Sequence, residues 1–293
     1  MTTQDIVDSP SRTVIRDAYE ERLAAYWNTK QNDPVNLLLG EIDGLYHHHY
    51  GVGDYDPAIL DGTPEQREEN IVRELHRLEN AQAELIAQSL AGLGPQDRVL
   101  DAGSGRGGTS FLLHDRYGCR VDGANISEYH LEFSRRAARQ RGYQDKVRFH
   151  FRNMVDTGFA DASFQGVVTN ETTMYVDLPE LFGEFARVLE PGGRYVCITW
   201  CRNDLVADSS PESEEIDRHY LSRMHRRSTY FSALAETGLV PVSVVDLTSE
   251  AIPYWELRTH SSHRTGIEQP FIDAYRANRM NFLLIVAENM SPR

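Results

Sequence analysis

The feature that most constrains the fold is a glycine-rich turn between an apolar run and a helical segment, RVLDAGSGRGGTSFLL, at residues 98–113. The apolar run ends at Asp101, and Gly103, Gly105 and Gly107 follow at every second position. Glycine adopts positive φ without strain and lets the backbone approach a ligand closely. The unpaired N–H groups at the start of the next helix favour an anionic group. The pattern predicts a small-molecule site at the carboxyl end of a strand, the alternative being a tight turn without a ligand.

The rest of the chain predicts the sheet to which this turn belongs. Short apolar runs alternate with helical stretches, which is typical of parallel strands joined by crossover helices. The runs cover residues 98–101, 120–123, 147–151, 165–169, 194–200, 241–247 and 282–287, and the helical stretches cover 107–116, 127–141, 179–189 and 228–237. We therefore predict a doubly wound α/β fold with a seven-stranded sheet. The last run follows a long insertion and can return antiparallel, as an edge strand.

Segments outside this alternation predict a cap over the α/β domain. We expect an N-terminal cap of helices and loops over residues 1–94, followed by the main domain over 95–293. Within the cap, the spacing of apolar residues predicts helices over 14–28 and 65–91, and the glycine- and aromatic-rich segment 34–56 predicts an ordered loop. Two insertions in the main domain, at about 201–226 and 249–280, are expected to cover the substrate.

Charge and cysteine content argue against several classes of protein. A formal net charge of −14 over 293 residues disfavours general nucleic-acid binding, which usually needs a basic face. A membrane-spanning helix needs about 18 consecutive apolar residues, and no run in the sequence is nearly that long. Residues 1–13 lack the apolar region of an export signal. The uneven spacing of Cys119, Cys197 and Cys201 suggests reduced, buried thiols. We expect a cytoplasmic protein without nucleic-acid or membrane partners, and a homo-oligomer remains possible.

The arrangement D-x-G-x-G-x-G at the turn resembles the S-adenosylmethionine (SAM)-binding motif of class I methyltransferases. A dinucleotide site shares the glycines, but the second strand, VDGANISEYH, ends without a clear acid for a ribose. Asn125 stands where the family usually has that acid, and His130 stands where related turns have glutamine. RNMVDTGF resembles the adenine-contacting turn, although Met154 can equally fill the core. The resemblance implies these cofactor-binding residues: Asp101, Gly103, Gly105, Asn125, Ile126, His130, Asn153, Met154 and Asn170.

Polar residues after the fourth strand are candidates for the chemistry. In TNETTMYVDLPELF, Asn170 and Glu171 should lie at the ligand-binding edge of the sheet. A glutamate among apolar groups suits a general base, although Glu171 can instead cap a turn or contact the cofactor. The residues of the HHHY block, His47–Tyr50, are too close in sequence for the three histidines to bind one metal ion. They suit a mixed polar and aromatic pocket, or a packed loop.

Aromatic and arginine residues in the second half suit an apolar ligand that ends in a phosphate. Most rings in a domain belong to its core and most arginines lie at its surface, so this reading competes with a purely structural one. The residues that we predict to contact the substrate are His48, His49, Tyr175, Trp200, Arg202, Tyr220 and Tyr254.

Longer blocks resemble the geranyl diphosphate C-methyltransferase family of actinomycetes. They are PVNLLLGEIDGLYHHHYGVG, ELHRLENAQAE, LDAGSGRGG, NETTMYVDL, GGRYVCIT and IPYWELRTHSS with TGIEQPFI. The resemblance extends roughly from Tyr26 to Ala287. It implies a class I, Rossmann-like methyltransferase that moves a methyl group from SAM to an alkene carbon of a prenyl diphosphate in terpenoid biosynthesis. It also implies Mg²⁺ at the diphosphate, held mainly by substrate oxygens and water, and the protein ligands of the metal stay unassigned.

The same resemblance implies a mechanism. Methylation of an alkene leaves a carbocation, which loses a proton to a base. We assign the base to Glu171 and expect Tyr50 to orient that base or a water molecule. Geranyl diphosphate, methylated at C2 or C6, is the expected substrate. Isopentenyl or farnesyl diphosphate is the alternative, as is a sterol, acyl or small phenolic substrate, or a non-catalytic module with the same fold.

Overall fold

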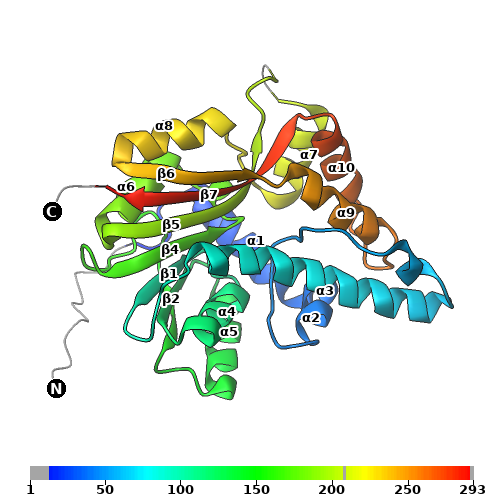
Figure 1. The fold of residues 1–293 in the computed structure, drawn as a ribbon, viewed down its shortest axis with the longest axis horizontal. Coiled ribbons are helices and arrows are strands. Elements are labelled where there is room, and N and C mark those ends of the chain that lie inside the picture. Colours follow the sequence, from blue (N-terminus) through cyan, green and yellow to red (C-terminus); the bar gives the residue numbers. More distant parts are fainter. Residues whose placement is uncertain (1–12, 207–208, 291–293) are drawn as a thin grey trace.

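In a computed structural model that describes residues 13–206 and 209–290, seven strands form one sheet in the order β3-β2-β1-β4-β5-β7-β6 (Figure 1). The strands are β1 Arg98–Ala102, β2 Arg120–Asn125, β3 Val147–Phe151, β4 Phe164–Asn170, β5 Leu189–Arg202, β6 Leu239–Asp246 and β7 Met280–Asn289. β1 to β5 pair in parallel, and β7 pairs antiparallel with both β5 and β6. The doubly wound α/β fold is confirmed.

The prediction that the last strand lies at an edge is wrong. β7 is antiparallel, as expected, but it lies between β5 and β6. Its residues are buried on both faces, whereas Val240, Val242, Val244 and Val245 of β6 are exposed. β7 therefore has the covering of an internal strand, and β6 forms the edge.

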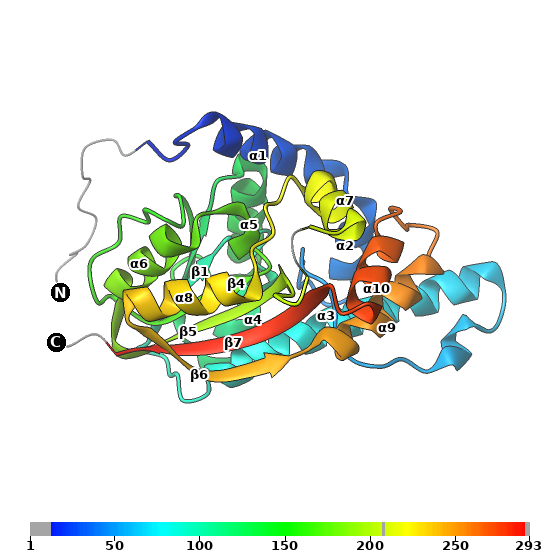
Figure 2. The ribbon, with the colours of Figure 1, turned by 90° about the horizontal axis from the view of Figure 1, so that it is seen from above.

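Helices cover both faces of the sheet (Figures 1 and 2). Neighbouring side chains of a strand point to opposite faces, so Val167 joins one apolar core and Val168 the other. The core with Val168 includes residues of α3 Pro64–Ser89, α4 Gly108–Tyr117 and α5 Glu128–Arg141; the core with Val167 includes residues of α6 Leu178–Val188 and α8 Arg227–Thr237.

The cap is more helical than the sequence predicted. Residues 34–56 were expected to form a loop, but Pro34–Gly40 forms α2, with Pro34 at its first turn and Val35 and Leu39 buried. Proline suits the first turn of a helix because its missing N–H has no partner to lose there. The remaining cap elements are α1 Ala18–Asn28, η1 Thr29–Asn32, η2 Pro57–Leu60, η3 Thr173–Tyr175, α7 Pro211–Tyr220, α9 Thr248–Thr259 and α10 Glu268–Arg276.

The first cap helix and the first insertion lie side by side. Figure 2 shows α1 beside α7, and Tyr19 and Tyr26 of α1 donate hydrogen bonds to the carbonyls of Leu221 and His219 at 2.8 and 3.1 Å. α9 and α10 pack against each other at the end of α3. The expected insertions are therefore helical and meet the N-terminal cap.

All three cysteines are free and buried. Among the described residues, no helix is long and apolar enough to cross a bilayer. Residues 1–12, on which the expected lack of an export signal depends, lie outside the described part of the chain.

Candidate active site

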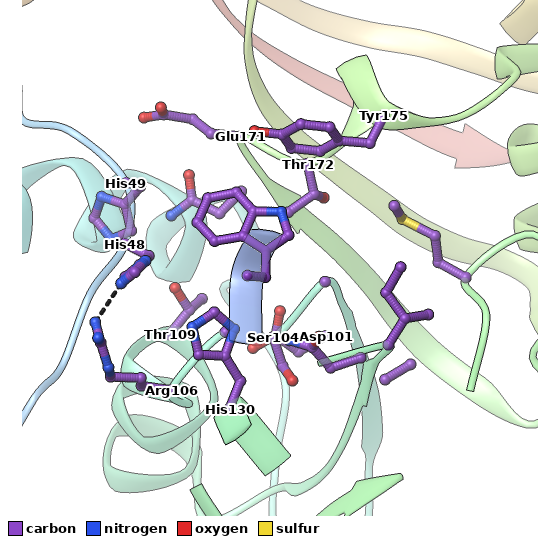
Figure 3. Close-up of a pocket in the computed structure, with 18 of the residues that line it drawn as sticks. His48, His49, Asp101, Ser104, Arg106, Thr109, His130, Glu171, Thr172 and Tyr175 are labelled. Atoms are coloured by element: carbon purple, nitrogen blue, oxygen red, sulfur yellow. Dashed lines mark hydrogen bonds between the residues drawn. The ribbon is translucent and has the colours of Figure 1, made fainter. Parts of the chain in front are cut away.

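A cavity of about 950 Å³ opens at the carboxyl ends of β1, β2 and β4 (Figure 3). Figure 3 shows Glu171 and Tyr175 on one side and Asp101 and Ser104 on the opposite side. All nine residues that we predicted to bind a cofactor line this one cavity, which we call the main cavity: Asp101, Gly103, Gly105, Asn125, Ile126, His130, Asn153, Met154 and Asn170. They come from four separate strand ends, which the doubly wound topology brings together.

The glycine turn has the conformation that its sequence predicted. Gly103, Gly105 and Gly107 have φ values of +85°, +51° and +92°. A Cβ atom on Gly103 would lie 2.5 Å from Cγ2 of Thr172, so a larger residue does not fit there without displacing that side chain. Thr172 Oγ1 donates a hydrogen bond to the carbonyl of Ala102 at 3.0 Å, which holds the threonine against the turn. The turn is therefore closely packed against Thr172, and both Gly103 and Thr172 line the cavity.

Asp101 is buried at the start of this turn. Ser110 of α4 donates a hydrogen bond to its Oδ2 at 2.5 Å. Burial raises the pKa of Asp101 to about 6, and the hydrogen bond from Ser110 opposes this increase by stabilising the charged form. Asp101 is therefore held in one orientation by α4.

Asn125 ends β2 and also organises the next turn. Its Oδ1 accepts a hydrogen bond from the backbone N–H of Ser127 at 2.8 Å, and Ser127 caps α5. The neighbouring acid Asp122 points elsewhere, because it pairs with Arg98 and His150 at 2.6 Å each. Asn125 is thus the polar side chain of β2 that lines the cavity.

Asn153 and Met154 hold the turn after β3. Asn153 donates a hydrogen bond from Nδ2 to the carbonyl of Val14 at 3.0 Å, and its Oδ1 accepts from the N–H of Val155 at 3.2 Å. Met154 lines the cavity and also packs against the core, so both alternatives for this residue apply.

Glu171, the predicted base, follows β4 with a φ of +54° and is 6% exposed. Its Oε1 accepts hydrogen bonds from the backbone N–H of Tyr50 at 3.0 Å and from Nε2 of Gln82 at 2.8 Å. Within the described part of the chain, Oε2 has no hydrogen-bond partner. Burial raises the pKa of Glu171 well above its ordinary value, the N–H of Tyr50 opposes this, and nearby Glu79 adds to it. Glu171 is the kind of buried carboxyl that suits proton transfer.

The three histidines of the HHHY block have separate partners. His47 pairs with Asn80 at 2.9 Å, His48 accepts a hydrogen bond from Arg106, and His49 Nδ1 donates to the carbonyl of Tyr50 at 2.8 Å. Burial lowers the pKa of His47 to about 4 and the pKa values of His48 and His49 well below their ordinary value. His48 and His49 line the main cavity as neutral side chains.

A second cavity, of about 870 Å³, adjoins the first. Trp27 and His48 line both cavities, so these two residues form the boundary between them. The second cavity is also lined by Lys30, Asp33, Asn36, Tyr50, His219, Tyr220 and Arg258, most of which are charged or polar. Arg258 is 4% exposed, and its Nε pairs with Glu268 at 3.1 Å.

Predictions for the substrate side are mixed. Tyr175 lines the main cavity, and Tyr50 and Tyr220 line the second. Tyr50 contacts Glu171 through its backbone N–H rather than its phenol. Trp200, Arg202 and Tyr254 do not line either of these two cavities, and their role as substrate contacts stays a prediction.

Trp200 and Tyr254 contact residues beside the cavities, whereas Arg202 lies at the end of β5. Trp200 packs against Tyr50, with ring centroids 5.7 Å apart, and Tyr254 donates a hydrogen bond to Glu79 at 2.8 Å. Arg202 ends β5, where its backbone N–H donates to the carbonyl of His225.

Sequence reasoning missed several residues of the site. Trp27, Arg106 and Thr172 line the main cavity, Lys30 and Asp33 line the second, and Gln82 contacts Glu171. The polar stretch TKQNDPVN, residues 29–36, was one signal, because polar side chains before an apolar helix start often serve a ligand or a cap.

Known proteins share both this fold and much of this sequence. Residues 99–193 match the family model described as methyltransferase domain. The geranyl diphosphate 2-C-methyltransferases of Saccharopolyspora erythraea and Streptomyces lasalocidi are 48% and 46% identical, each over 93% of this chain and over 95% and 91% of their own lengths. The crystal structure of geranyl diphosphate C-methyltransferase from Streptomyces coelicolor A3(2), in complex with Mg²⁺, geranyl-S-thiolodiphosphate and S-adenosyl-L-homocysteine, superposes with a TM-score of 0.91 at 45% identity. That match covers 94% of this chain and 99% of the other. The chain belongs to the geranyl diphosphate C-methyltransferase family.

Proposed function

We propose that this chain transfers the methyl group of SAM to C2 of geranyl diphosphate. The observation that carries the proposal is that two cavities meet at Trp27 and His48. One surrounds the glycine turn, and the other contains the cations Lys30 and Arg258. The names of the curated relatives favour C2 over C6, the two positions that the sequence left open.

The main cavity fits SAM. Gly103 has a positive φ and lines the cavity, so its backbone is open to a ligand, as a cradle for the amino-acid part of the cofactor requires. Asn125 presents an amide that hydrogen-bonds ribose hydroxyls without a charge. Ile126 and Met154 supply apolar surface for the adenine. Bound SAM supplies the electrophilic methyl group and a positive sulfonium charge.

The second cavity fits a diphosphate with Mg²⁺. Among the described residues, no group of three or more histidines, cysteines or acids is placed to hold a metal ion. Asp33, hydrogen-bonded at 2.7 Å by Asn36, offers one carboxylate. Mg²⁺ commonly binds one or two carboxylates, with phosphate oxygens and water completing its shell. Asp33 would hold the ion, which would neutralise diphosphate charge beside Lys30 and Arg258.

The rings around Tyr50 suit a carbocation. Its ring centroid lies 4.2 Å from that of Trp255, which stacks on Phe271 at 4.0 Å. Aromatic faces attract positive charge, most strongly where water is excluded. Together with Trp200 and Tyr220, these rings form what we call the aromatic cluster. We expect it to stabilise the tertiary cation that methylation leaves on the substrate.

Glu171 completes the reaction in this proposal. A C–H bond next to the cationic carbon breaks, its electron pair forms the new double bond, and the proton passes to Oε2 of Glu171. The carboxylate must be ionised for this step, although burial raises its pKa. A nearby sulfonium charge favours the ionised form.

The decisive experiment incubates the purified protein with SAM, Mg²⁺ and isopentenyl, geranyl or farnesyl diphosphate, and locates the new methyl group by NMR. We expect 2-methylgeranyl diphosphate and loss of activity with EDTA, restored by added Mg²⁺. Absence of turnover with all three substrates would overturn the proposal. Activity on a sterol, acyl or phenolic substrate that survives EDTA would support the alternative.

Other expectations remain proposals. The buried, free thiols support a cytoplasmic location, and the net charge of −14 supports the expected lack of a nucleic-acid partner. We retain the division into a cap over residues 1–94 and a domain over 95–293, and we leave the homo-oligomer open. Cell fractionation and light scattering of the purified protein test location and assembly.

A further inference from the structure

A buried amide on the long helix α3 contacts the base and a cofactor-side residue together. Gln82 is fully buried. Its Nε2 donates to Oε1 of Glu171 at 2.8 Å and to Oδ1 of Asn170 at 3.0 Å, and its Oε1 accepts from Nδ2 of Asn170 at 2.9 Å. Asn170 lines the main cavity. The amide of Gln82 therefore uses all its groups on two neighbouring residues at the end of β4.

These contacts make the two oxygens of Glu171 unequal. Oε1 accepts from Gln82 and from the backbone N–H of Tyr50, whereas Oε2 has no partner among the described residues. Donors lower the basicity of the oxygen that they contact, because they stabilise its negative charge. Oε2 is the oxygen left to receive a proton.

We propose that Gln82 is a positioning residue for the reaction, whose amide holds Glu171 by Oε1 and keeps its carboxylate ionisable while leaving Oε2 free. This inference rests on the proposed role of Glu171 as the base. Gln82 touches neither the substrate nor the cofactor in this proposal, and it acts through Glu171 and Asn170.

Other titratable groups near Glu171 also interact electrostatically with its carboxyl. They are Glu79 of α3, Tyr50 of the HHHY block, Tyr175 of η3 and Tyr275 of α10. Burial keeps these tyrosines neutral by raising their pKa values well above the ordinary one. Glu79 opposes ionisation of Glu171 by like charge. Of the two α3 side chains named here, Glu79 opposes the ionised form of Glu171, whereas the hydrogen bond from Gln82 favours it.

The test replaces Gln82 by methionine, which has a similar volume and no donor. Infrared difference spectra across pH follow the C=O stretch of the protonated carboxyl of Glu171, identified by its absence in Glu171→Gln. Loss of a hydrogen bond to a charged group should raise the pKa of Glu171 by about one pH unit or more. An unchanged titration midpoint in folded Gln82→Met would overturn the inference.

Turnover gives a second readout. The acid limb of kcat should move to higher pH in Gln82→Met, and activity should recover at a pH above the new pKa. A purely structural defect would lower kcat at every pH with no shift of the limb, and this result would also overturn the inference. Gln88→Met, an exposed site on the same helix, is the matched control.

Two further measurements keep the outcomes distinct. Binding of S-adenosylhomocysteine and the melting temperature check that each variant is folded. If Gln82→Met does not fold, Gln82→Leu, which also lacks a donor, replaces it. An unchanged titration midpoint of Glu171 in that variant overturns the inference. Full activity of Glu171→Gln would instead refute the base itself, separately from Gln82.

Discussion

Substitution of Gly103 by alanine tests the glycine turn most directly, because the structure separates two costs. The first is backbone strain, since Gly103 has a φ of +85°. The second is steric, because an added Cβ would lie 2.5, 2.8 and 2.9 Å from Cγ2, Cβ and Oγ1 of Thr172. Left-handed backbone costs an L residue about 1–2 kcal/mol, and overpacking costs about 1–3 kcal/mol. We expect Gly103→Ala to lower the free energy of unfolding by about 2–5 kcal/mol.

Gly142→Ala is the matched control for the strain. Gly142 ends α5 with a φ of +73°, and an added Cβ there would meet nothing within 4 Å. It should cost only the backbone part, about 1–2 kcal/mol. The difference between the two variants in urea unfolding then measures the contact with Thr172. Thr172→Gly in the Gly103→Ala background should recover part of that difference, once the cost of Thr172→Gly alone is subtracted.

Ligand binding provides the functional part of this test. If the turn shifts to accept the Cβ, the cavity that Gly103 lines changes shape, and S-adenosylhomocysteine should bind at least about tenfold more weakly, or about 1.4 kcal/mol. Isothermal titration calorimetry measures this for both variants, and Gly142→Ala should bind normally. Equal destabilisation by the two substitutions, with unchanged affinity, would refute the reasoning.

Three other substitutions probe the site. Glu171→Gln should keep its affinity for S-adenosylhomocysteine while kcat falls on the order of 10²-fold, and near-normal turnover would remove Glu171 from its role. Lys30→Met should raise the KM for geranyl diphosphate about tenfold or more in steady-state assays, because a charged contact with the diphosphate is lost; an unchanged KM would place the diphosphate elsewhere. Burial lowers the pKa of His47 to about 4, so between about pH 6.5 and 4 this histidine is protonated in the unfolded chain and neutral in the native one. The free energy of unfolding should therefore fall as the pH falls from about 6.5 toward 4. In urea unfolding, His47→Gln should make that decline shallower by about 1.4 kcal/mol per pH unit, with exposed His260→Gln as control; an equal slope would contradict the burial argument.

The parts of the site that follow from local sequence were predictable. The glycine turn, the strand ends and Glu171 lie where parallel strands must end, so one topology brings them to one edge. The helix α2 could not be predicted, because its seven residues from Pro34 give too short a periodic pattern beside many aromatic residues. Ring composition does not show which rings face a cavity, and Trp200 and Tyr254, which we predicted as substrate contacts, line neither of the two cavities.

Gln82 was predictable in part. The buried face of α3 follows the series Ile71, Leu75, Leu78, Gln82 and Ile86, so a polar residue stands at a core position. Such a residue needs buried partners, and this requirement is a signal. Its partners lie about ninety positions later in the chain, at the end of β4, and only the packed structure identifies them.

The proposed proton transfer to Glu171 has a consequence for the net charge of the main cavity. An unpaired negative charge buried there would be costly, and so would an unpaired positive one. In the proposed reaction the donor arrives positive and meets a negative carboxylate. It leaves with a neutral sulfur, while the carboxyl has gained a proton and is neutral too. In this proposal the sulfonium charge and the carboxylate charge therefore disappear together in each methyl transfer.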